Sequence, residues 1–205
     1  MPSPAMLEGN LWQQLLVGGV GGVLAILPSG STGAGAAHVF PVDADSDYGS
    51  VHHDYAATDI FAACGSSVVS PVAGTVLEVN RVDRWDPVSD RGAARGGRFV
   101  SILGRDGVRY YGSHLSTVRE VVEPGATVWA GRAVGRVGRS GSARSTSCHL
   151  HFGISPVCAG TGQWWIRRGV VGPYRFLGGW RAGRSLSPAD AVTDWERKRG
   201  CPSPP

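Results

Sequence analysis

Two histidines stand two residues apart in the segment SCHLHFGI, residues 147–154, where they alternate with large apolar residues. This alternation predicts a β-strand, and side chains at positions i and i+2 of a strand project from the same face. His149 and His151 should therefore share one small volume, while Leu150 and Phe152 face the opposite layer. Neutral imidazole is the commonest metal ligand and a frequent general base, so the pair is a candidate chemical site.

A second group of candidate ligands lies in the segment VHHDYAATDIFA, residues 51–62. On an extended backbone His53 and Asp59 have equal parity and reach the same face, whereas His52 turns away. A β-bulge would exchange the roles of the two histidines, and the sequence leaves that alternative open. Asp54 is an alternative carboxylate, but it faces the side opposite to its neighbour His53.

A further polar group, His114, ends a predicted strand, where site residues are often placed. His53, Asp59 and His151 together offer two nitrogens and one carboxylate oxygen, the usual protein ligand set of a catalytic zinc ion. Zinc lowers the pKa of a bound water to about 7 and polarises a bound carbonyl. His114 and His149 would then be available to take the proton of that water and to donate to the oxyanion.

The elements that position these groups are predicted to be short strands. The chain has 205 residues and 31 glycines, many valines and no long helical periodicity, which favours one all-β domain with a terminal appendage. Residues 65–76 (GSSVVSPVAGTV) resemble residues 125–137 (GATVWAGRAVGRV) with one residue inserted, and both read as strand, glycine turn, strand. We therefore expect a duplicated antiparallel β-hairpin core. A lipoyl- or biotin-carrying domain is excluded, because the only lysine, Lys198, lies outside both segments.

The remaining segments predict a hairpin and one helix. Residues 99–103 and 108–111 flank a glycine-rich turn, and a long polar loop over residues 81–98 precedes them. A helix is predicted from about Pro188 to Arg199, with Ser187 as N-cap and Gly200 after its last residue. Its apolar stripe of Pro188, Val192 and Trp195 should dock on the domain. Aromatic and basic residues alternate near residues 164–168 and 174–176, where they either line a substrate groove or pack on the sheet.

An apolar run over residues 11–27 is followed by a proline and by small residues up to Ala36, the layout of a secretory signal. Glu8 stands where a positive charge is expected, so an uncleaved N-terminal anchor is the alternative, although 17 residues are short for a membrane span. Export would make the four cysteines candidates for two disulfides with three pairings. We favour a pairing of Cys64 with Cys148, because both lie near candidate site residues. Cys158 would then pair with Cys201.

The formal net charge is +4, and every basic residue except Lys198 is an arginine. These arginines are scattered, and no nucleic-acid-binding module is visible. The charge fits an anionic polymer or ordinary solvated side chains equally well.

Four blocks together resemble the M23 family of zinc metallopeptidases, also called LytM or lysostaphin-like. They are H-x5-D from His53, YGSHLS over residues 111–116, the glycine-rich residues 124–141, and HLHFG over residues 149–153. The resemblance covers roughly residues 48 to 156. It implies a duplicated antiparallel β fold and hydrolysis of stem peptides or cross-links in peptidoglycan. One departure is that the common opening motif, H-x-G-x-D, is two residues shorter and contains a glycine.

Carried onto this chain, the resemblance implies that His53, Asp59 and His151 bind zinc and that His114 and His149 are the catalytic pair. We therefore expect a secreted, monomeric zinc endopeptidase whose partner is peptidoglycan peptide, with no nucleic acid and with membrane contact only through an uncleaved N-terminal segment. The expected organisation is a signal or anchor (1–36), a metallopeptidase domain (38–160) and a C-terminal extension (161–205). A non-catalytic wall-binding or hydrolase-activator module is the alternative. A histidine-phosphorylated sugar-transport protein fits less well, because of the export signal and the carboxylate.

Overall fold

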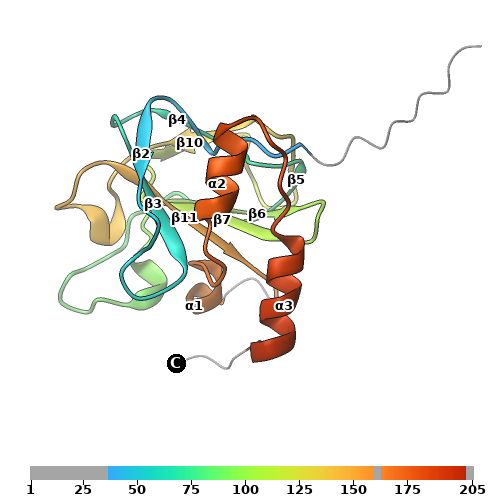
Figure 1. Ribbon diagram of the computed structural model, residues 1–205. Coiled ribbons are helices and arrows are strands. Elements are labelled where there is room, and N and C mark those ends of the chain that lie inside the picture. The colour runs from blue at the N-terminus through green and yellow to red at the C-terminus, as the bar shows by residue number, and fades with distance from the viewer. Residues whose placement is uncertain (1–36, 159–162, 202–205) are drawn as a thin grey trace, which may run out of the picture. The chain divides into compact units, whose positions relative to one another are not determined.

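The computed structural model describes residues 37–158 and 163–201, which form two antiparallel β-sheets, three short α-helices and two single-turn 3-10 helices, Gly92–Ala94 and Gly141–Ala143 (Figure 1). The predicted signal segment, residues 1–36, lies outside the described residues. Within the described ranges, no helix is both long enough and apolar enough to cross a membrane. The mostly antiparallel β architecture confirms the predicted fold class.

The larger sheet has seven strands in the order β2-β3-β11-β7-β6-β5-β9, and the smaller sheet has four in the order β1-β4-β10-β8. The strands are β1 (Val42–Asp43), β2 (Ser46–Tyr48), β3 (Ala57–Ala62), β4 (Ser67–Val69), β5 (Gly74–Asn80), β6 (Phe99–Gly104), β7 (Arg109–Ser113), β8 (Thr117–Val118), β9 (Thr127–Val128), β10 (Ala133–Arg136) and β11 (His149–Ser155).

The two similar sequence segments pair with each other. The first forms β4 and the start of β5, and the second forms β9 and β10. Strand β4 pairs with β10 in the smaller sheet, and β5 pairs with β9 in the larger sheet. Each segment thus supplies one strand to each sheet, so the duplicated antiparallel core predicted from the repeat is present. The two strands of one segment lie in different sheets and pair with the other segment, so the segments themselves are not hairpins.

Strand β11 is central to the site because it lies between β3 and β7 in the larger sheet. Its apolar side chains face the core, where Leu150 and Ile154 are fully buried and Phe152 is 2% exposed. The predicted hairpin of β6 and β7 adjoins it, and its turn contains Gly107 with φ of 77°, a left-handed conformation that favours glycine. The three neighbouring strands β3, β11 and β7 therefore bring the candidate site residues together.

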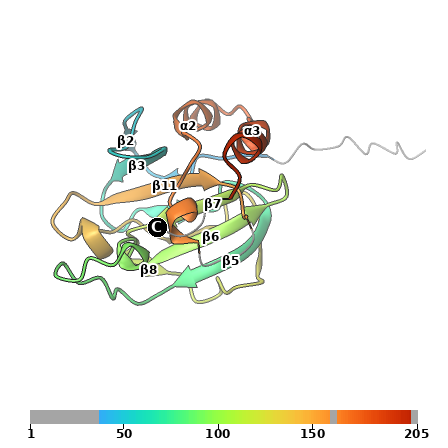
Figure 2. The same cartoon turned by 90° about the horizontal axis from the view of Figure 1, so that it is seen from below.

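Three helices follow the sheet: α1 (Trp164–Arg167), α2 (Tyr174–Arg181) and α3 (Ala189–Arg199). Helices α2 and α3 lie on the same side of the larger sheet (Figure 2). The docking of α3 agrees with the prediction, since Pro188 and Val192 are buried and Trp195 is half-buried. Helices α1 and α2 were not predicted, because α1 is one turn long and α2 contains two glycines, which have low helix propensity. Burial of Phe176, Leu177 and Trp180 stabilises α2 instead.

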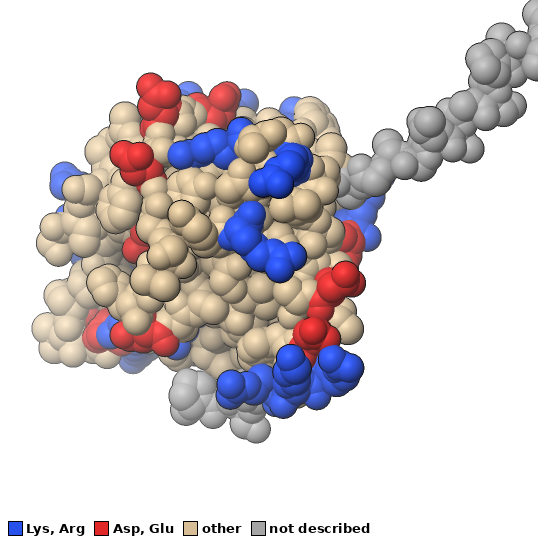
Figure 3. Space-filling view, viewed as in Figure 1, with Lys and Arg blue, Asp and Glu red and all other residues tan. Residues whose placement is uncertain are grey.

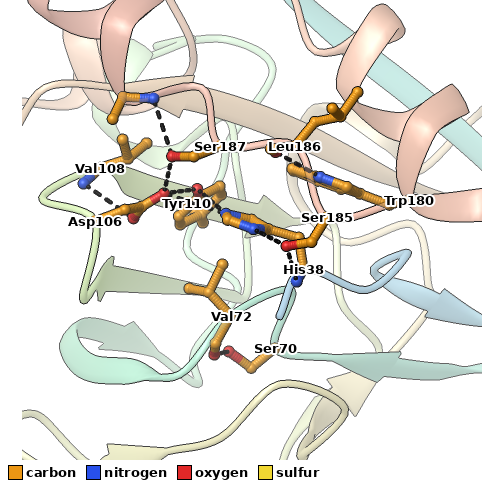
Figure 4. Close-up of polar contacts among 11 residues, drawn as sticks. His38, Ser70, Val72, Asp106, Val108, Tyr110, Trp180, Ser185, Leu186 and Ser187 are labelled. Carbon is orange, nitrogen blue, oxygen red and sulfur yellow. Dashed lines mark hydrogen bonds and ion pairs between the residues drawn. The ribbon is translucent and has the colours of Figure 1, made fainter. Parts of the chain in front are cut away.

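A hydrogen-bonded cluster around His38 attaches this C-terminal extension to the sheet (Figure 4). His38 Nδ1 lies 3.1 Å from Ser185 Oγ, and its Nε2 lies 3.1 Å from Asp106 Oδ2. Ser187 Oγ and Tyr110 Oη each donate a hydrogen bond of 2.7 Å to the same carboxylate oxygen. The first described residues, the β6–β7 turn and the α2–α3 linker are thereby held together.

The structure contains two disulfides, Cys64–Cys148 and Cys158–Cys201, which is the pairing predicted from the sequence. The first joins the segment after β3 to the residue that precedes β11. The second connects the segment after β11 to the segment after α3. On the face that carries α2 and α3, acidic and basic side chains are interspersed (Figure 3). Basic residues gather in the last turn of α3, where positive charge favours the helix dipole.

Candidate active site

A polar cleft with a volume of about 410 Å³ lies over strands β3, β11 and β7. Its lining includes all of the histidines and the aspartate that the sequence singled out: His52, His53, Asp59, His114, His149 and His151. Residues separated by almost a hundred positions in the chain therefore meet in one place. A second, more open depression adjoins it, since Thr146 lines both.

The register of β3 and β11 brings Asp59 and His151 together. The two residues are direct cross-strand partners, and His151 Nδ1 lies 2.9 Å from Asp59 Oδ1. Two residues along the same strands, His149 is the cross-strand partner of Phe61. His149 also lines the cleft, and its Nε2 lies 4.0 Å from Asp59 Oδ2. The prediction that His149 and His151 share one face is thus met by the geometry.

The structure brings His52, and not His53, to this pair. His52 Nε2 lies 3.7 Å from Asp59 Oδ2, and His52, Asp59 and His151 form a group whose ligand atoms all lie within 4.8 Å of one another. His53 is exposed at the edge of the cleft. The parity argument fails because β3 begins only at Ala57. Residues 51–56 are not extended strand, so alternation does not decide which histidine faces Asp59.

His151 provides a test of whether the group suits a metal ion. Its Nε2 lies 2.9 Å from the Arg168 carbonyl oxygen, and its Nδ1 faces the Asp59 carboxylate. Both neighbours only accept hydrogen bonds, and a neutral imidazole carries one N–H. When Nε2–H donates to the carbonyl, the Nδ1 lone pair points at a carboxylate oxygen, so a proton or a metal ion must lie between them. His52 makes no hydrogen bond with the described residues, so its ring is also available to an ion.

The charge states suit a cation. Burial disfavours the Asp59 carboxylate, but the hydrogen bond from His151 and the nearby imidazoles outweigh it and hold the pKa of Asp59 at about 2. Burial, together with His151, lowers the pKa of His52 to about 4. At neutral pH the group therefore offers an ionised carboxylate and a neutral imidazole, the forms that bind metal.

The other two histidines are held by backbone carbonyls. His149 Nδ1 donates to the Ser147 carbonyl at 2.8 Å, and His114 Nδ1 donates to the Ser140 carbonyl at 2.8 Å. Each bond fixes the tautomer and leaves Nε2 as the nitrogen available to the cleft. Burial, with His151 and His149 nearby, lowers the pKa of His114 to about 3, so its resting form is neutral.

His114 reaches the cleft through an unusual backbone turn. Its φ of 64° places a non-glycine residue in the left-handed region just after β7. Its N–H donates to the Gly96 carbonyl at 2.9 Å, which helps to maintain the turn. The ring then lies 5.0 Å from that of His149 and 5.9 Å from that of His151, between centroids. Two imidazoles thus border the candidate metal group, and each has a ring nitrogen that can accept or relay a proton.

Sequence reasoning missed Tyr55 and the Arg168 carbonyl. The Tyr55 ring lies 4.4 Å from that of His52, and burial raises the pKa of its hydroxyl to about 12. For the basic and aromatic residues 164–168, the sequence leaves groove lining and packing on the sheet as alternatives. The structure places Trp164, Arg167 and Arg168 in the cleft lining. A backbone carbonyl has no sequence signature, so the contact to His151 could not have been read from residue types.

Comparison with solved structures gives the same fold. A putative glycyl-glycine endopeptidase LytM from Ruminococcus gnavus aligns with a TM-score of 0.55 and 24% identity, over 73% of this chain and 62% of that chain. A putative peptidase M23 from Pseudomonas aeruginosa gives a TM-score of 0.51 and 23% identity, over 71% and 52%. The antimicrobial peptidase lysostaphin from Staphylococcus simulans gives 0.50 and 22%, over 78% and 55%. This chain therefore spans only about half to three fifths of these proteins.

No curated protein matches the chain. Residues 53–162, more than half of the sequence, match Peptidase family M23. That stretch contains Asp59, both catalytic candidates and His151, and its neighbours in structure have the same β-rich fold. The chain belongs to Peptidase family M23.

Proposed function

We propose that this protein is a secreted zinc metalloendopeptidase that hydrolyses peptide bonds in peptidoglycan, with His52, Asp59 and His151 as the zinc ligands. The observation that carries the proposal is the pairing of His151 Nδ1 with the Asp59 carboxylate while Nε2 is taken by a carbonyl. Two nitrogens and one oxygen form a usual catalytic zinc set, which leaves a position for water. His52 takes the place that the sequence motif suggested for His53.

A bound zinc ion would acidify a water molecule and polarise the scissile carbonyl. The protein's own groups move the proton. His149, with Nδ1–H held by the Ser147 carbonyl, accepts the proton of the attacking water at Nε2. The imidazolium so formed then gives that proton to the leaving amine nitrogen.

His114 supports the same step from the other side of His149. Its Nδ1–H is also donated to a carbonyl, so in its neutral form Nε2 is an acceptor that can orient the water. It can donate to the oxyanion of the tetrahedral intermediate only after it has received a proton. The two histidines therefore have different roles, with His149 as base and His114 as orienting group.

The cellular location is part of the proposal. Two disulfides are typical of an oxidising compartment, which supports export to the cell envelope. The structural neighbours include the antimicrobial peptidase lysostaphin and a putative glycyl-glycine endopeptidase, which supports a cell-wall peptide as substrate.

The test uses the full chain. Elemental analysis should find about one zinc per chain, and incubation with purified peptidoglycan should release peptide fragments with new amino termini. A chelator should stop the release and added zinc should restore it. His149→Ala is the matched control, which should keep zinc but lose most turnover. A folded protein that binds peptidoglycan without zinc and without release would refute the enzyme and support the activator module.

A further inference from the structure

We propose that Arg168 binds a carboxylate of the peptide substrate close to the scissile bond, so that the enzyme prefers anionic over amidated peptidoglycan peptides. This inference rests on the proposed peptidase function and concerns the specificity of the same cleft. Arg168 follows α1 and lies beyond residues 53–162, so it belongs to the extension that the family match does not cover.

The charge pairing within the cleft singles Arg168 out. Three arginines line the cleft: Arg95, Arg167 and Arg168. Arg95 pairs with Asp90, through Nε to Oδ1 at 2.9 Å, and Arg167 Nη1 lies 3.0 Å from Glu78 Oε1. Arg168 forms no ion pair with any carboxylate of the described residues, and its Nε is buried without a hydrogen-bond partner there. An arginine in this state can bind an anion without breaking an existing pair.

Aromatic rings hold the Arg168 guanidinium in place. Its Cζ lies 3.9 Å from the centre of the Tyr55 ring and 5.5 Å from that of Trp164. A guanidinium that rests on aromatic rings keeps its N–H edge for hydrogen bonds, and that planar fork matches a carboxylate in a bidentate manner. Because the side chain is already ordered, little conformational entropy is lost on binding.

The position of Arg168 relative to the candidate metal group defines where the carboxylate lies. The Tyr55 ring lies between them: the Arg168 guanidinium packs on it, and its centre lies 4.4 Å from that of the His52 ring and 5.7 Å from that of the His151 ring. An extended peptide advances about 3.3 Å per residue. The bound carboxylate therefore belongs to a residue about one to three positions from the scissile bond.

The backbone of Arg168 has a separate task, and this allows the side chain to be tested alone. Its carbonyl accepts the hydrogen bond from His151 Nε2, and a side-chain substitution leaves that carbonyl in the chain. Arg168→Ala removes the proposed anion contact, and Arg168→Lys keeps the charge without the fork. Arg184→Ala is the matched control, because Arg184 is an exposed arginine of the same extension that does not line the cleft.

The experiment compares two purified cross-linked stem-peptide dimers that differ only in whether the carboxylates flanking the cross-link are free or converted to carboxamides. For the zinc-loaded wild-type protein we expect kcat/KM to be about tenfold to a hundredfold higher for the free acid, the range of a charge-assisted hydrogen bond. Arg168→Ala should bring this ratio close to one, Arg168→Lys should give an intermediate ratio, and Arg184→Ala should keep the wild-type ratio. Zinc content and the circular dichroism spectrum are measured for each variant.

The wild-type ratio tests the inference without any variant. Equal cleavage of the two dimers by the wild-type protein would overturn the role of Arg168 and leave the peptidase function intact. A wild-type preference that persists in folded, zinc-loaded Arg168→Ala would also overturn it. Failure of the folded, zinc-loaded wild-type protein to cleave either dimer or whole peptidoglycan would instead overturn the proposed function.

Discussion

Replacing each of the two adjacent histidines separately tests the assignment of the first metal ligand. His52→Ala removes a nitrogen that lies 3.7 Å from Asp59 Oδ2, whereas His53→Ala removes an exposed ring outside the group of ligand atoms. Loss of groups that merely support a ligand costs about 10- to 100-fold in metal affinity. We therefore expect His52→Ala to weaken zinc binding by at least about 100-fold. His53→Ala should change it by less than about threefold, because exposed substitutions away from such features cost within about 0.5 kcal/mol.

The difference can be measured as a change in stability. With free zinc at about 1,000 times the wild-type Kd, binding adds about 4 kcal/mol to the free energy of unfolding. At the same zinc concentration, a 100-fold weaker His52→Ala variant would gain only about 1.4 kcal/mol. At about 2–4 °C per kcal/mol, the zinc-induced rise in Tm should be smaller by about 5–10 °C than that of the wild type.

The assay is thermal unfolding of the wild type and both variants, each with chelator and with buffered zinc, together with release of fragments from peptidoglycan. Both readouts should separate the variants in the same direction. The reasoning is refuted if His53→Ala loses the zinc-induced stabilisation and His52→Ala keeps it. In that case residues 51–56 would adopt a different path when the ion is bound, and His53 would be the ligand.

Three more predictions follow from the site and its support. A Cβ at Gly153 would overlap the Arg168 carbonyl, so Gly153→Ala should weaken zinc binding by about 10- to 100-fold, measured by competition with a chromogenic chelator. Breaking Cys64–Cys148 by replacing both cysteines with serine opens a loop closed over 84 residues, and urea unfolding should show a loss of about 4.5 kcal/mol on the chain-entropy model. In the zinc-free folded protein, the pKa of His52 is lowered from 6.5 to about 4 and that of His114 from 6.5 to about 3. Protons therefore bind these histidines more tightly in the unfolded chain, and the folded state is favoured where both rings are neutral. Stability should be full above pH 6.5 and should fall by about 2 kcal/mol per histidine by pH 5, measured by urea unfolding.

Each of these has a distinct contrary outcome. Unchanged zinc affinity in a folded Gly153→Ala protein would show that the carbonyl does not position His151. Equal stability with and without Cys64–Cys148 would show that the sheet alone fixes the start of β11. A zinc-free protein that gains stability between pH 6.5 and 5 would contradict the neutral resting state of the two histidines.

The sequence predicted most of the fold because its signals are local. The alternation around His149 and His151 fixes which face of β11 points to the cleft, and Leu150 and Phe152 are buried as that pattern requires. The repeated strand-turn-strand segments pair with each other, because the edge of each strand needs a hydrogen-bonding partner. Helix α2 escaped prediction because burial of its aromatic side chains, and not its intrinsic propensity, stabilises it.

The candidate site was predicted only in part, and the missing pieces are those that no periodic rule governs. Asp59, His114, His149 and His151 lie on strands or directly after one, and all line the cleft. His52 lies in an irregular segment, where side chains do not alternate between two faces as they do in a strand. The even spacing to Asp59 therefore pointed to His53 instead of His52. Tyr55 and the extension around Arg168 enter the cleft through tertiary packing, which a single sequence does not encode as a pattern.

The boundaries of the family match have a practical consequence for anyone who would produce a minimal version of this protein. A fragment trimmed to residues 53–162 would start one residue after His52 and stop before Arg168. It would carry every motif by which the family is recognised, yet it would lack an imidazole beside Asp59 and the oxygen that anchors His151. We therefore expect the smallest fragment that keeps the proposed zinc site to extend beyond residues 53–162 at both ends.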